Sequence, residues 1–355
     1  MAHDDEQMDA DGQDDRLVSP GEQPGEAATD RTLRPARLEE FIGQKRIIEN
    51  LRVYITAARQ RGEALDHVLF CGPPGLGKTT LAYIIGNELD VDVHITAGPA
   101  VEHKGVLAGL LTGLEPREVL FLDEIHRLNP AVEEYLYPAM EDWVIDVPSG
   151  TGAFSQTLRL PLQPFTLIGA TTRSGLLTSP LRDRFGIVER LDHYGQEDMV
   201  LIVKRSAGIM KLEVNEDAVQ EIGRRSRGTP RVANRLLRRV RDFAEVYGDG
   251  RVTMAISKRA LTALAIDALG LDGMDRNLLR TVIEKYAGGP VGIEALAASL
   301  NEERDTLENE IEPFLIQLAL IQRTPRGRVA MPAAYIHLGL PMPEEAPGGG
   351  QGTLF

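Results

Sequence analysis

The sequence is poor in residues that would build a disulfide, a zinc site or a membrane segment. Cys71 is its single cysteine, which excludes an intrachain disulfide, and no Cys/His cluster is present to hold zinc. Because Cys71 ends a short apolar run, we expect it to be a buried strand residue. No run approaches the roughly 18 apolar residues that a membrane span needs, and the N-terminus lacks the basic start and apolar stretch of a signal peptide. We therefore expect a soluble, cytoplasmic protein.

Net positive charge is also missing. The formal charge is −14, whereas proteins that bind nucleic acid usually present a basic surface. The acids are unevenly distributed, however, because residues 1–30 carry a net charge of −9 and leave only −5 for the rest. Residues 1–32 are too polar to gain much burial and are predicted to be a disordered acidic tail, with a second flexible tail at 341–355. The charge of the whole chain therefore does not exclude a local surface for DNA.

Residues 33–194 alternate short apolar runs with helical stretches. The runs are HVLFC, VDVHIT, EVLFLDE, PFTLIGATTR and GIVERL. Runs this apolar, separated by helices, predict parallel strands covered on both faces, and thus a large α/β domain. Two alternating segments around a Gly/Ser-rich tip predict an inserted β-hairpin between Ile145 and Leu160. An ordinary surface excursion is the alternative interpretation of that segment.

Strand signals stop after Tyr194. Helical periodicity then predicts a small helical domain over residues 195–271, with helices at Gln196–Gly208, Asn215–Ser226, Pro230–Tyr247 and Ser257–Leu269. Residues 272–340 are predicted to form three further helices, Arg276–Tyr286, Ile293–Ser299 and Thr306–Ala319, followed by two short strands around a Pro/Gly turn. Three helices and a hairpin wing are typical of a winged-helix domain.

A glycine-rich phosphate-binding motif follows the first apolar run. CGPPGLGKTT satisfies G-x-x-x-x-G-K-[ST] and opens a helical stretch, so strand, loop and helix are all present. The glycines allow backbone N–H groups to surround phosphates, Lys78 reaches the β- and γ-phosphates, and Thr79 can ligate Mg²⁺. We assign nucleotide binding to the loop and the start of its helix, at Gly75, Gly77, Lys78, Thr79 and Thr80. A chance glycine-rich turn is the alternative.

Two acids, Asp123 and Glu124, close the apolar run EVLFLDE. The carboxyl ends of strands are where ligands bind in open α/β sheets. Asp123 would hold Mg²⁺, and Glu124 would orient and deprotonate the attacking water. Acid pairs are usually solvated, but two acids that close a buried strand are costly to desolvate without a role.

Polar and basic residues follow the later strands. Thr172, or with less support Thr171, is predicted to bond the γ-phosphate or the attacking water. Arg184 is preferred to Arg182 as an arginine that stabilises transition-state charge, although either could form an ordinary surface ion pair. Arg231, just inside a helix start, needs an anionic partner, which we take to be the nucleotide. The other arginines of that helix are expected to be solvated or subunit-facing, namely Arg235, Arg238, Arg239 and Arg241.

An arginine cluster lies near the end of the chain, in QRTPRGRVA. Pro325 and Gly327 favour a tight turn that would project Arg323, Arg326 and Arg328 from a wing toward DNA phosphates. We add Arg304, two residues before the predicted helix Thr306–Ala319, to these DNA-contact candidates. The alternative is that the arginines only keep the hairpin soluble.

The motifs occur in the order of the AAA+ ATPases. The segments RPARLEEFIGQ, LFCGPPGLGKTTLA, LDEIHRLNP, LIGATTRSGLLTSPLRDRFGIVERL, RGTPRVANRLLRRVRDFAEV, GGPVG and QRTPRGRVA more specifically resemble the RuvB family of Holliday-junction branch-migration motors. The resemblance implies a homohexamer that hydrolyses ATP with Mg²⁺ and pulls duplex DNA from junctions together with RuvA and RuvC. Homologous recombination, DNA repair and the SOS response to DNA damage are the processes it implies.

The resemblance also implies residue roles. Thr172 is similar to sensor 1, Arg184 to the finger that acts in trans, and Arg231 to sensor 2. Leu33, Arg34 and Tyr194 resemble the adenine-side contacts, and Glu141, Asp142 and Trp143 lie close to the nucleotide in the family. The hairpin Ile145–Leu160 resembles the element that docks on RuvA.

Two other functions compete with that of a DNA motor. A clamp loader shares the ATPase core, but its chain normally ends in a helical collar without a wing. A nucleotide-gated switch or scaffold would bind ATP and hydrolyse it poorly, and Glu124 argues against that function because such proteins commonly lose the base.

Overall fold

The computed structural model describes residues 17–21, 31–149 and 156–342. The described residues fall in two compact units. One contains residues 31–149 and 156–258, and the other contains residues 17–21 and 259–342. The division falls inside a helix, α10 (Met254–Ala263), which lies within the region predicted to be the small helical domain. In the part of the chain that is described, no helix combines the length and apolar character needed to cross a membrane.

A five-stranded sheet is the centre of the first unit. Its strands are β1 (Val68–Cys71), β2 (Val93–Ala97), β3 (Val119–Asp123), β6 (Thr166–Thr171) and β7 (Ile187–Arg190). They lie in the order β2-β3-β6-β1-β7, and all neighbouring pairs are parallel, as the apolar runs predicted. Cys71 is buried at the end of β1, also as predicted. The carboxyl ends of β1, β3 and β6 therefore meet at one edge.

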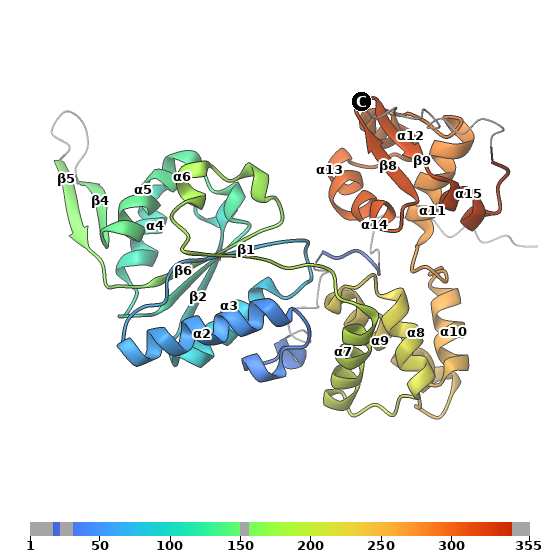
Figure 1. The fold of residues 1–355 in the computed structure, drawn as a ribbon, viewed down its shortest axis with the longest axis horizontal. Helices are drawn as coiled ribbons and strands as arrows, with labels where there is room; N and C mark the ends of the chain where they lie inside the picture. The colour runs from blue at the N-terminus through green and yellow to red at the C-terminus, as the bar shows by residue number, and fades with distance from the viewer. Residues whose placement is uncertain (1–16, 22–30, 150–155, 343–355) are drawn as a thin grey trace, which may run out of the picture. The chain divides into compact units, whose positions relative to one another are not determined.

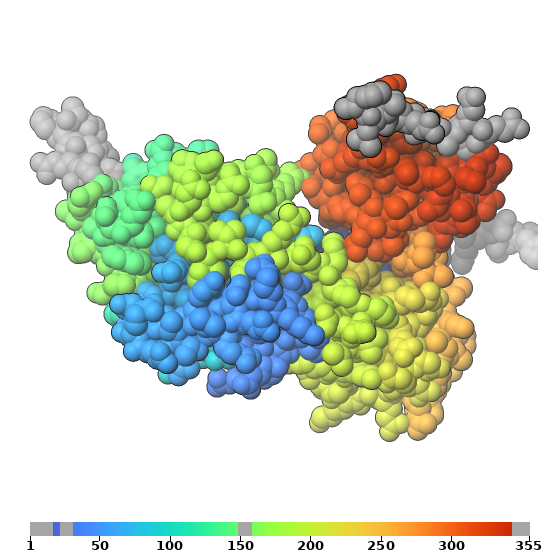
Figure 2. Space-filling view, in the orientation of Figure 1, coloured from blue at the N-terminus to red at the C-terminus, as the bar shows by residue number. Residues whose placement is uncertain are grey.

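Helices cover both faces of this sheet (Figure 1). On one face lie α2 (Lys45–Arg61) and α3 (Lys78–Leu89), and on the other α4 (Lys104–Thr112), α5 (Pro130–Glu141) and the short α6 (Ser179–Arg182). Four single turns, η1 (Leu38–Glu40), η2 (Gly98–Ala100), η3 (Ile125–Arg127) and η4 (Ser174–Leu176), connect these elements. Helix α2 buries Ile47, Leu51 and Ile55, spaced four residues apart, because one stripe of the helix faces the sheet. Figure 2 shows the molecular surface in the same orientation, in which the residues of the first unit run from blue through green to yellow.

The predicted hairpin is present. β4 (Val144–Ser149) pairs antiparallel with β5 (Gln156–Pro161), with Ile145 opposite Leu160. An ion pair of 3.1 Å joins Asp146 to Arg159 across the two strands. The Gly/Ser-rich tip of the hairpin lies outside the described residues. Because the described residues of this segment pair in a regular antiparallel register, they do not form an irregular surface loop, which was the alternative interpretation.

A buried histidine ties the base of this hairpin to the sheet. The Nε2 of His67 lies 3.2 Å from the carbonyl oxygen of Met140, and its Nδ1 accepts the backbone N–H of Leu167 at 2.9 Å. A carbonyl can only accept, so the proton is on Nε2. The ring also packs edge-on against Trp143, at 5.6 Å between ring centroids, and lies beside Phe165. Burial lowers the pKa of His67 below its ordinary value.

We expect this histidine to make stability depend on pH. The unfolded chain protonates His67 near pH 6.5, whereas the folded chain resists protonation, so the free energy of unfolding is undiminished above that pH and falls as the pH drops toward the lower folded-state pKa. Each unit of pKa difference corresponds to about 1.4 kcal/mol. The amide of glutamine offers a donor and an acceptor without titrating. The melting temperature of His67→Gln should therefore fall less between pH 7.5 and pH 5.5 than that of the native chain. His94→Gln, at an exposed position, is the control, and equal losses in all three proteins would contradict this role.

The helices of the predicted small helical domain, which we call the lid, follow in the same unit. They are α7 (Gln196–Ile209), α8 (Glu216–Arg225) and α9 (Pro230–Tyr247), all close to their predicted limits. Helix α10 begins and ends earlier than the predicted 257–269. The expectation that Arg235 is solvated or subunit-facing is wrong, because its side chain is only 1% exposed. Arg235 lies on the same face of α9 as Val232, Leu236 and Val240, which are buried in the lid.

The second unit has the predicted winged-helix pattern. Its helical segments are α11 (Gly273–Arg280) with η5 (Thr281–Lys285), α12 (Ile293–Leu300), and a third made of α13 (Arg304–Thr306), η6 (Leu307–Ile311) and α14 (Glu312–Gln317). The wing consists of β8 (Ile321–Thr324) and β9 (Gly327–Ala330), which pair antiparallel. A closing helix, α15 (Pro332–Leu338), was not predicted. Leu278, Leu296 and Leu315 belong to the shared apolar core that holds the three helical segments together.

A short part of the predicted acidic tail is packed in this unit. Val18 is fully buried, and Ser19 Oγ donates to Glu310 Oε2 at 2.5 Å. Leu17 and Val18 are an apolar pair in an otherwise polar stretch, which gives this segment something to bury. The other tail residues, 1–16, 22–30 and 343–355, lie outside the described residues.

Candidate active site

The glycine-rich loop joins β1 to α3. Gly72, Gly75 and Gly77 have φ angles of 138°, 76° and 104°, a region that residues with a side chain rarely adopt. A Cβ on Gly72 would lie 2.4 Å from the carbonyl oxygen of Leu191, so this position requires glycine on steric grounds as well. The backbone thus curls at the N-terminus of a twelve-residue helix, which is the arrangement that binds phosphate groups.

Lys78 is a buried cation inside this loop. Its Nζ donates to the carbonyl oxygens of Gly72 and Pro73, at 2.7 and 2.8 Å. Burial lowers the pKa of Lys78 to about 8, with Asp123 and Glu124 opposing the shift and Arg231 adding to it. A buried ammonium group favours an added anion beside it. The loop therefore fits a phosphate chain.

The acidic pair lies where the sequence predicted, at the end of β3. Asp123 is the last residue of the strand, and its Oδ1 accepts the backbone N–H of Glu124 at 2.9 Å. Glu124 has a φ of 47°, a strained value that is common at functional positions. Burial, and then the neighbouring Asp123, raises the pKa of Glu124. Thr79 and Asp123 fit Mg²⁺, which is usually held by one or two carboxylates and substrate phosphates.

The two threonines at the end of β6 have different surroundings. Thr172 Oγ1 lies 3.3 Å from Glu124 Oε2 and donates to it. Thr171 is fully buried, and its Oγ1 lies 3.0 Å from His126 Nδ1 and accepts the backbone N–H of Arg173 at the same distance. The geometry thus places Thr172 beside the acidic pair, as predicted. The sequence-based prediction missed His126, which the single turn η3 brings back toward Glu124.

Arg231 reaches the same site from the lid. It is the second residue of α9, after Pro230 at the first helical position and Thr229 at the N-cap. Its charge makes a small contribution to the lowered pKa of Lys78, after burial. A helix N-terminus and a lysine are both unfavourable neighbours for a guanidinium. An anion between them would relieve that repulsion.

Tyr194 connects the loop to the lid. Its hydroxyl donates to the carbonyl oxygen of Leu76 at 2.9 Å, and its backbone N–H donates to Gly228 at 2.9 Å. Burial raises the pKa of Tyr194. Of the other predicted adenine-side residues, Leu33 is buried and accepts from Arg205 through its carbonyl oxygen at 2.6 Å, and the Arg34 guanidinium lies over the ring of Tyr83 at 5.6 Å.

Arg184 belongs to a separate group of side chains. Its guanidinium lies 4.3 Å from the ring centroid of Tyr137 and forms an ion pair of 3.2 Å with Glu141. Its Nη1 donates to the carbonyl oxygen of Pro180 at 2.6 Å, while its buried Nε has no hydrogen-bond partner among the residues that the structure describes. Arg182, the weaker candidate, is exposed at the end of α6.

Residues 141–143, at the end of α5 and directly after it, have different surroundings. Glu141 lies with Arg184, Asp142 is exposed, and Trp143 packs edge-on against Phe165 at 5.4 Å between ring centroids. Trp143 is thus part of the aromatic cluster beneath the hairpin. The predicted nucleotide contacts of these residues stay predictions.

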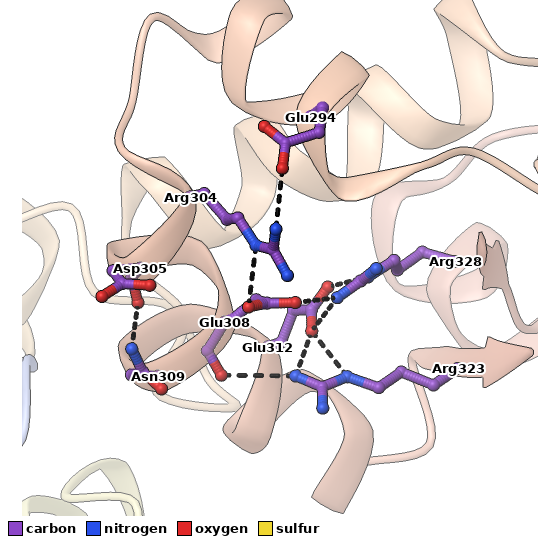
Figure 3. A network of polar contacts seen from close by, with 8 residues as sticks. All are labelled: Glu294, Arg304, Asp305, Glu308, Asn309, Glu312, Arg323 and Arg328. Atoms are coloured by element: carbon purple, nitrogen blue, oxygen red, sulfur yellow. Dashed lines mark hydrogen bonds and ion pairs between the residues drawn. The ribbon is translucent and has the colours of Figure 1, made fainter.

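Two of the wing arginines, Arg323 and Arg328, are held by acids (Figure 3). Arg323 and Arg328 face each other across the two strands, and both pair with Glu312, which is fully buried. Arg328 also pairs with Glu308 at 2.9 Å and is only 12% exposed. The expectation that the turn projects all three wing arginines is therefore wrong for Arg328. Glu308 and Glu312, four residues apart on one helical face, account for the difference.

Arg304 extends this network, and Arg326 stands apart from it. Arg304 pairs with Glu294 at 2.8 Å and with Glu308 at 3.1 Å, and its side chain is 53% exposed. Figure 3 shows three arginines and three glutamates joined in one network, which is formally neutral. Arg326 is exposed at the turn, and within the described residues no ion pair holds it. It is the wing cation most available to a phosphate.

A glycine-rich loop after β1, acids at the end of β3, a polar end of β6 and a lid arginine define a P-loop ATPase of the AAA+ class. The chain belongs to the RuvB family within that class. Residues 33–191 match the model of the Holliday junction DNA helicase RuvB P-loop domain, residues 194–267 that of the RuvB AAA lid domain, and residues 268–339 that of the RuvB C-terminal winged helix domain. The family resemblance and the fold class predicted from the sequence are confirmed.

Similar proteins span nearly the full chain. The Holliday junction branch migration complex subunit RuvB of Anaeromyxobacter sp. strain K is 56% identical over 339 residues, which cover 96% of this chain and 98% of that protein. The Myxococcus xanthus protein of the same name is 55% identical, over 94% of this chain and 96% of its own. The solved Thermotoga maritima RuvB Holliday junction branch migration motor has a TM-score of 0.80 at 50% identity and covers 88% of this chain and 100% of its own.

Proposed function

We propose that this chain is an ATP-driven motor that moves duplex DNA at Holliday junctions. Its relatives are named as a Holliday junction branch migration complex subunit and a Holliday junction branch migration motor. The observation that carries the proposal is the glycine-rich loop at the start of α3, which holds the buried Lys78 and lies at the sheet edge where β3 ends in Asp123 and the strained Glu124. ATP is the substrate of this site, and hydrolysis would be coupled to DNA translocation.

The residues divide the chemistry among them. Lys78 Nζ would exchange its two carbonyl partners for the β- and γ-phosphate oxygens, since a charged acceptor makes the stronger hydrogen bond. Thr79 and Asp123 would hold Mg²⁺, which supplies charge neutralisation between the phosphates. Glu124 would accept the proton of the attacking water, and its raised pKa makes it a stronger base. Thr172 would position that water, and Arg231 would bind phosphate from the lid.

Arg184 is proposed to act on the ATP of a neighbouring subunit in a homohexameric ring. It is grouped with Glu141 and Tyr137 on α5, whereas Lys78 donates its hydrogen bonds within the glycine-rich loop. An aromatic face and a carboxylate hold its guanidinium in place. Glu141 would then reach the same neighbouring nucleotide, which agrees with the role that the family resemblance implies for it.

The partners follow from the same family. The hairpin Ile145–Leu160 is proposed to dock on RuvA, and the exposed apolar side chain of Leu158 offers it a contact. RuvC would join the complex that resolves the junction. The process would serve homologous recombination, DNA repair and the SOS response in the cytoplasm.

The wing is proposed to contact the DNA backbone through Arg326. Arg326→Ala should reduce the slope of log affinity for duplex DNA against log salt by about one for each phosphate that the guanidinium neutralises. Gln322→Ala, an exposed neutral neighbour on the same wing, is the matched control and should leave the slope unchanged. An unaltered slope in Arg326→Ala, measured at constant protein assembly, would remove the turn from the DNA path.

Arg323 and Arg328 should behave differently from Arg326. Removing both leaves the buried Glu312 without a cation, and breaking a buried ion pair of this kind costs on the order of 3–5 kcal/mol. Weaker DNA binding by the double alanine variant would thus come with a lower melting temperature. Weaker DNA binding at an unchanged melting temperature would instead indicate direct phosphate contacts.

A DNA-stimulated ATPase assay tests the proposed function. Duplex DNA should raise ATP turnover by the native chain, and Lys78→Ala should be inactive because its affinity for the nucleotide is weakened. ATP binding with negligible turnover, with or without DNA, would favour a nucleotide-gated switch and overturn the motor.

A further inference from the structure

One face of α5 carries three side chains that are linked to Arg184. Glu133, Tyr137 and Glu141 are spaced four residues apart along this helix, so they lie in one row. The guanidinium of Arg184 lies over the ring of Tyr137, 4.3 Å from its centroid, and forms an ion pair of 3.2 Å with Glu141. Glu133, the third member of the row, is connected to the arginine through the hydroxyl of Tyr137.

The carboxylate of Glu133 holds two hydroxyl groups. Glu133 is only 7% exposed, and its Oε1 accepts from the hydroxyl of Tyr137 at 2.6 Å and also from the hydroxyl of Thr178. A buried carboxylate is costly unless it is hydrogen-bonded, and these two donors meet that need. Glu134, the next residue of the same helix, is exposed. The burial of Glu133 is therefore specific to its place in the row.

The bond to Thr178 reaches the segment that carries the arginine. Thr178 is the N-cap of α6, and its Oγ1 accepts the backbone N–H of Leu181 at 3.3 Å. Arg184 lies two residues after α6, and its Nη1 donates back to the carbonyl oxygen of Pro180 at 2.6 Å. A helix of four residues has little stability of its own. Glu133 thus anchors the short helix from which Arg184 extends.

The bond to Tyr137 fixes the ring under the guanidinium. It holds the hydroxyl end of the ring, and the cation–π attraction requires the cation to lie over the face of the ring. Burial, and then the bond to Glu133, raises the pKa of Tyr137, so the hydroxyl remains a donor at neutral pH. The Nε of Arg184 has no hydrogen-bond partner in the described part of the chain. The position of the guanidinium therefore depends on its face and its two Nη groups.

We infer that Glu133 is a positioning residue for Arg184. Through one carboxylate oxygen it fixes both the ring on which the guanidinium lies and the helix that precedes the arginine. It acts on the ATP of the neighbouring subunit only through Arg184. This inference rests on the proposed function, since it requires Arg184 to act in trans.

Variants of Glu133 should lower turnover without weakening ATP binding. Glu133→Ala should lower kcat by about tenfold to a hundredfold, the effect expected when a reacting group is misplaced by about an ångström. Its Kd for ATP should change by less than about twofold, because the glycine-rich loop is untouched. Glu133→Gln, whose amide oxygen can accept from both hydroxyls, should recover most of the kcat. Glu134→Ala is the matched control and should keep the native kcat.

Mixing experiments should show on which side of the subunit boundary Glu133 acts. Glu133→Ala has an intact glycine-rich loop, and Lys78→Ala has an intact Arg184 with its supports. Mixed rings of these two proteins should therefore exceed the summed turnover of the separate proteins. Glu133→Ala mixed with Arg184→Ala should not, because every interface then has a defective finger. The double variant Glu133→Ala/Arg184→Ala should be no slower than Arg184→Ala alone.

The opposite pattern would contradict the inference. Recovery with Arg184→Ala but not with Lys78→Ala would show that Glu133 serves the site of its own subunit. Native kcat in Glu133→Ala, or a loss of ATP affinity as large as the loss of kcat, would also overturn the positioning role. The mixture of Lys78→Ala and Arg184→Ala is the reference, and no recovery in it would overturn the trans finger and this inference together.

Tyr137→Phe tests the same inference if Glu133→Ala does not fold. It keeps the ring and the bond from Thr178 to Glu133, and removes only the hydroxyl that fixes the ring. Its kcat should fall by about twofold to tenfold, the change that corresponds to the net contribution of one hydrogen bond, with the Kd for ATP unchanged. Tyr137→Phe with native kcat would show that the bond to Glu133 does not position the ring, and would overturn the inference.

Discussion

Replacing Glu124 by glutamine should lower ATP turnover by about a hundredfold to ten-thousandfold, the range that a general base contributes, while ATP still binds. Glutamine keeps the shape of the side chain and the contact with Thr172, but its amide cannot accept a proton from water. The effect should therefore appear in kcat, since the carboxylate is needed mainly in the transition state. Fluorescent-nucleotide binding and steady-state turnover would measure the two effects separately.

Lys78→Ala is the matched control for that experiment. It removes the buried ammonium that the loop holds near Asp123 and Glu124, so it should weaken nucleotide affinity itself. The two variants should thus fail at different steps. Comparable turnover by Glu124→Gln and the native chain would show that another group is the base.

Replacing Arg184 by alanine should lower ATP turnover by about a thousandfold or more, which is what an arginine acting in trans contributes. Arg184→Ala and Lys78→Ala proteins should each be inactive alone. Mixed rings would contain interfaces in which an intact Lys78 loop meets an intact Arg184, and those interfaces should hydrolyse ATP. The recovered turnover should rise and then fall with the mixing ratio.

Arg182→Ala is the control for the finger, because Arg182 is two residues away and exposed. It should hydrolyse ATP at close to the native rate. If subunits demonstrably exchange and no turnover returns on mixing, Arg184 acts within its own subunit or serves only to hold Tyr137 and Glu141 in place. Native turnover by Arg184→Ala would remove it from the chemistry altogether.

Local patterns predicted where the glycine-rich loop, the acidic pair and Thr172 lie, because these parts depend on short segments. The glycine-rich loop needs only a strand before it and a helix after it, and CGPPGLGKTT supplies the motif with both. Asp123, Glu124 and Thr172 could be placed together because parallel strands end at a common edge. For Arg231 the sequence offers only the argument that a cation at a helix start favours an anionic partner, and its contact with the nucleotide stays a prediction.

Contacts between distant segments could not be predicted in the same way. His126 meets Thr171 only because β3 and β6 are neighbours and η3 turns back, and nothing in LDEIH indicates where its ring points. Arg323 and Arg328 of the wing have no acid nearby in the sequence, yet Glu308 and Glu312 of the preceding helical segment neutralise them. The burial of Arg235 also depends on tertiary packing, because the apolar face of α9 that carries it packs into the lid core.

ATP-dependent movement of the branch point in a synthetic four-way junction tests the central claim most directly. With RuvA present, the native chain should convert a labelled junction into duplex products, and the products should require ATP hydrolysis. Glu124→Gln should assemble on the same junction with ATP bound and yield no products. A native chain that hydrolyses ATP but leaves the branch point in place, or a Glu124→Gln protein that moves it equally well, would contradict the account.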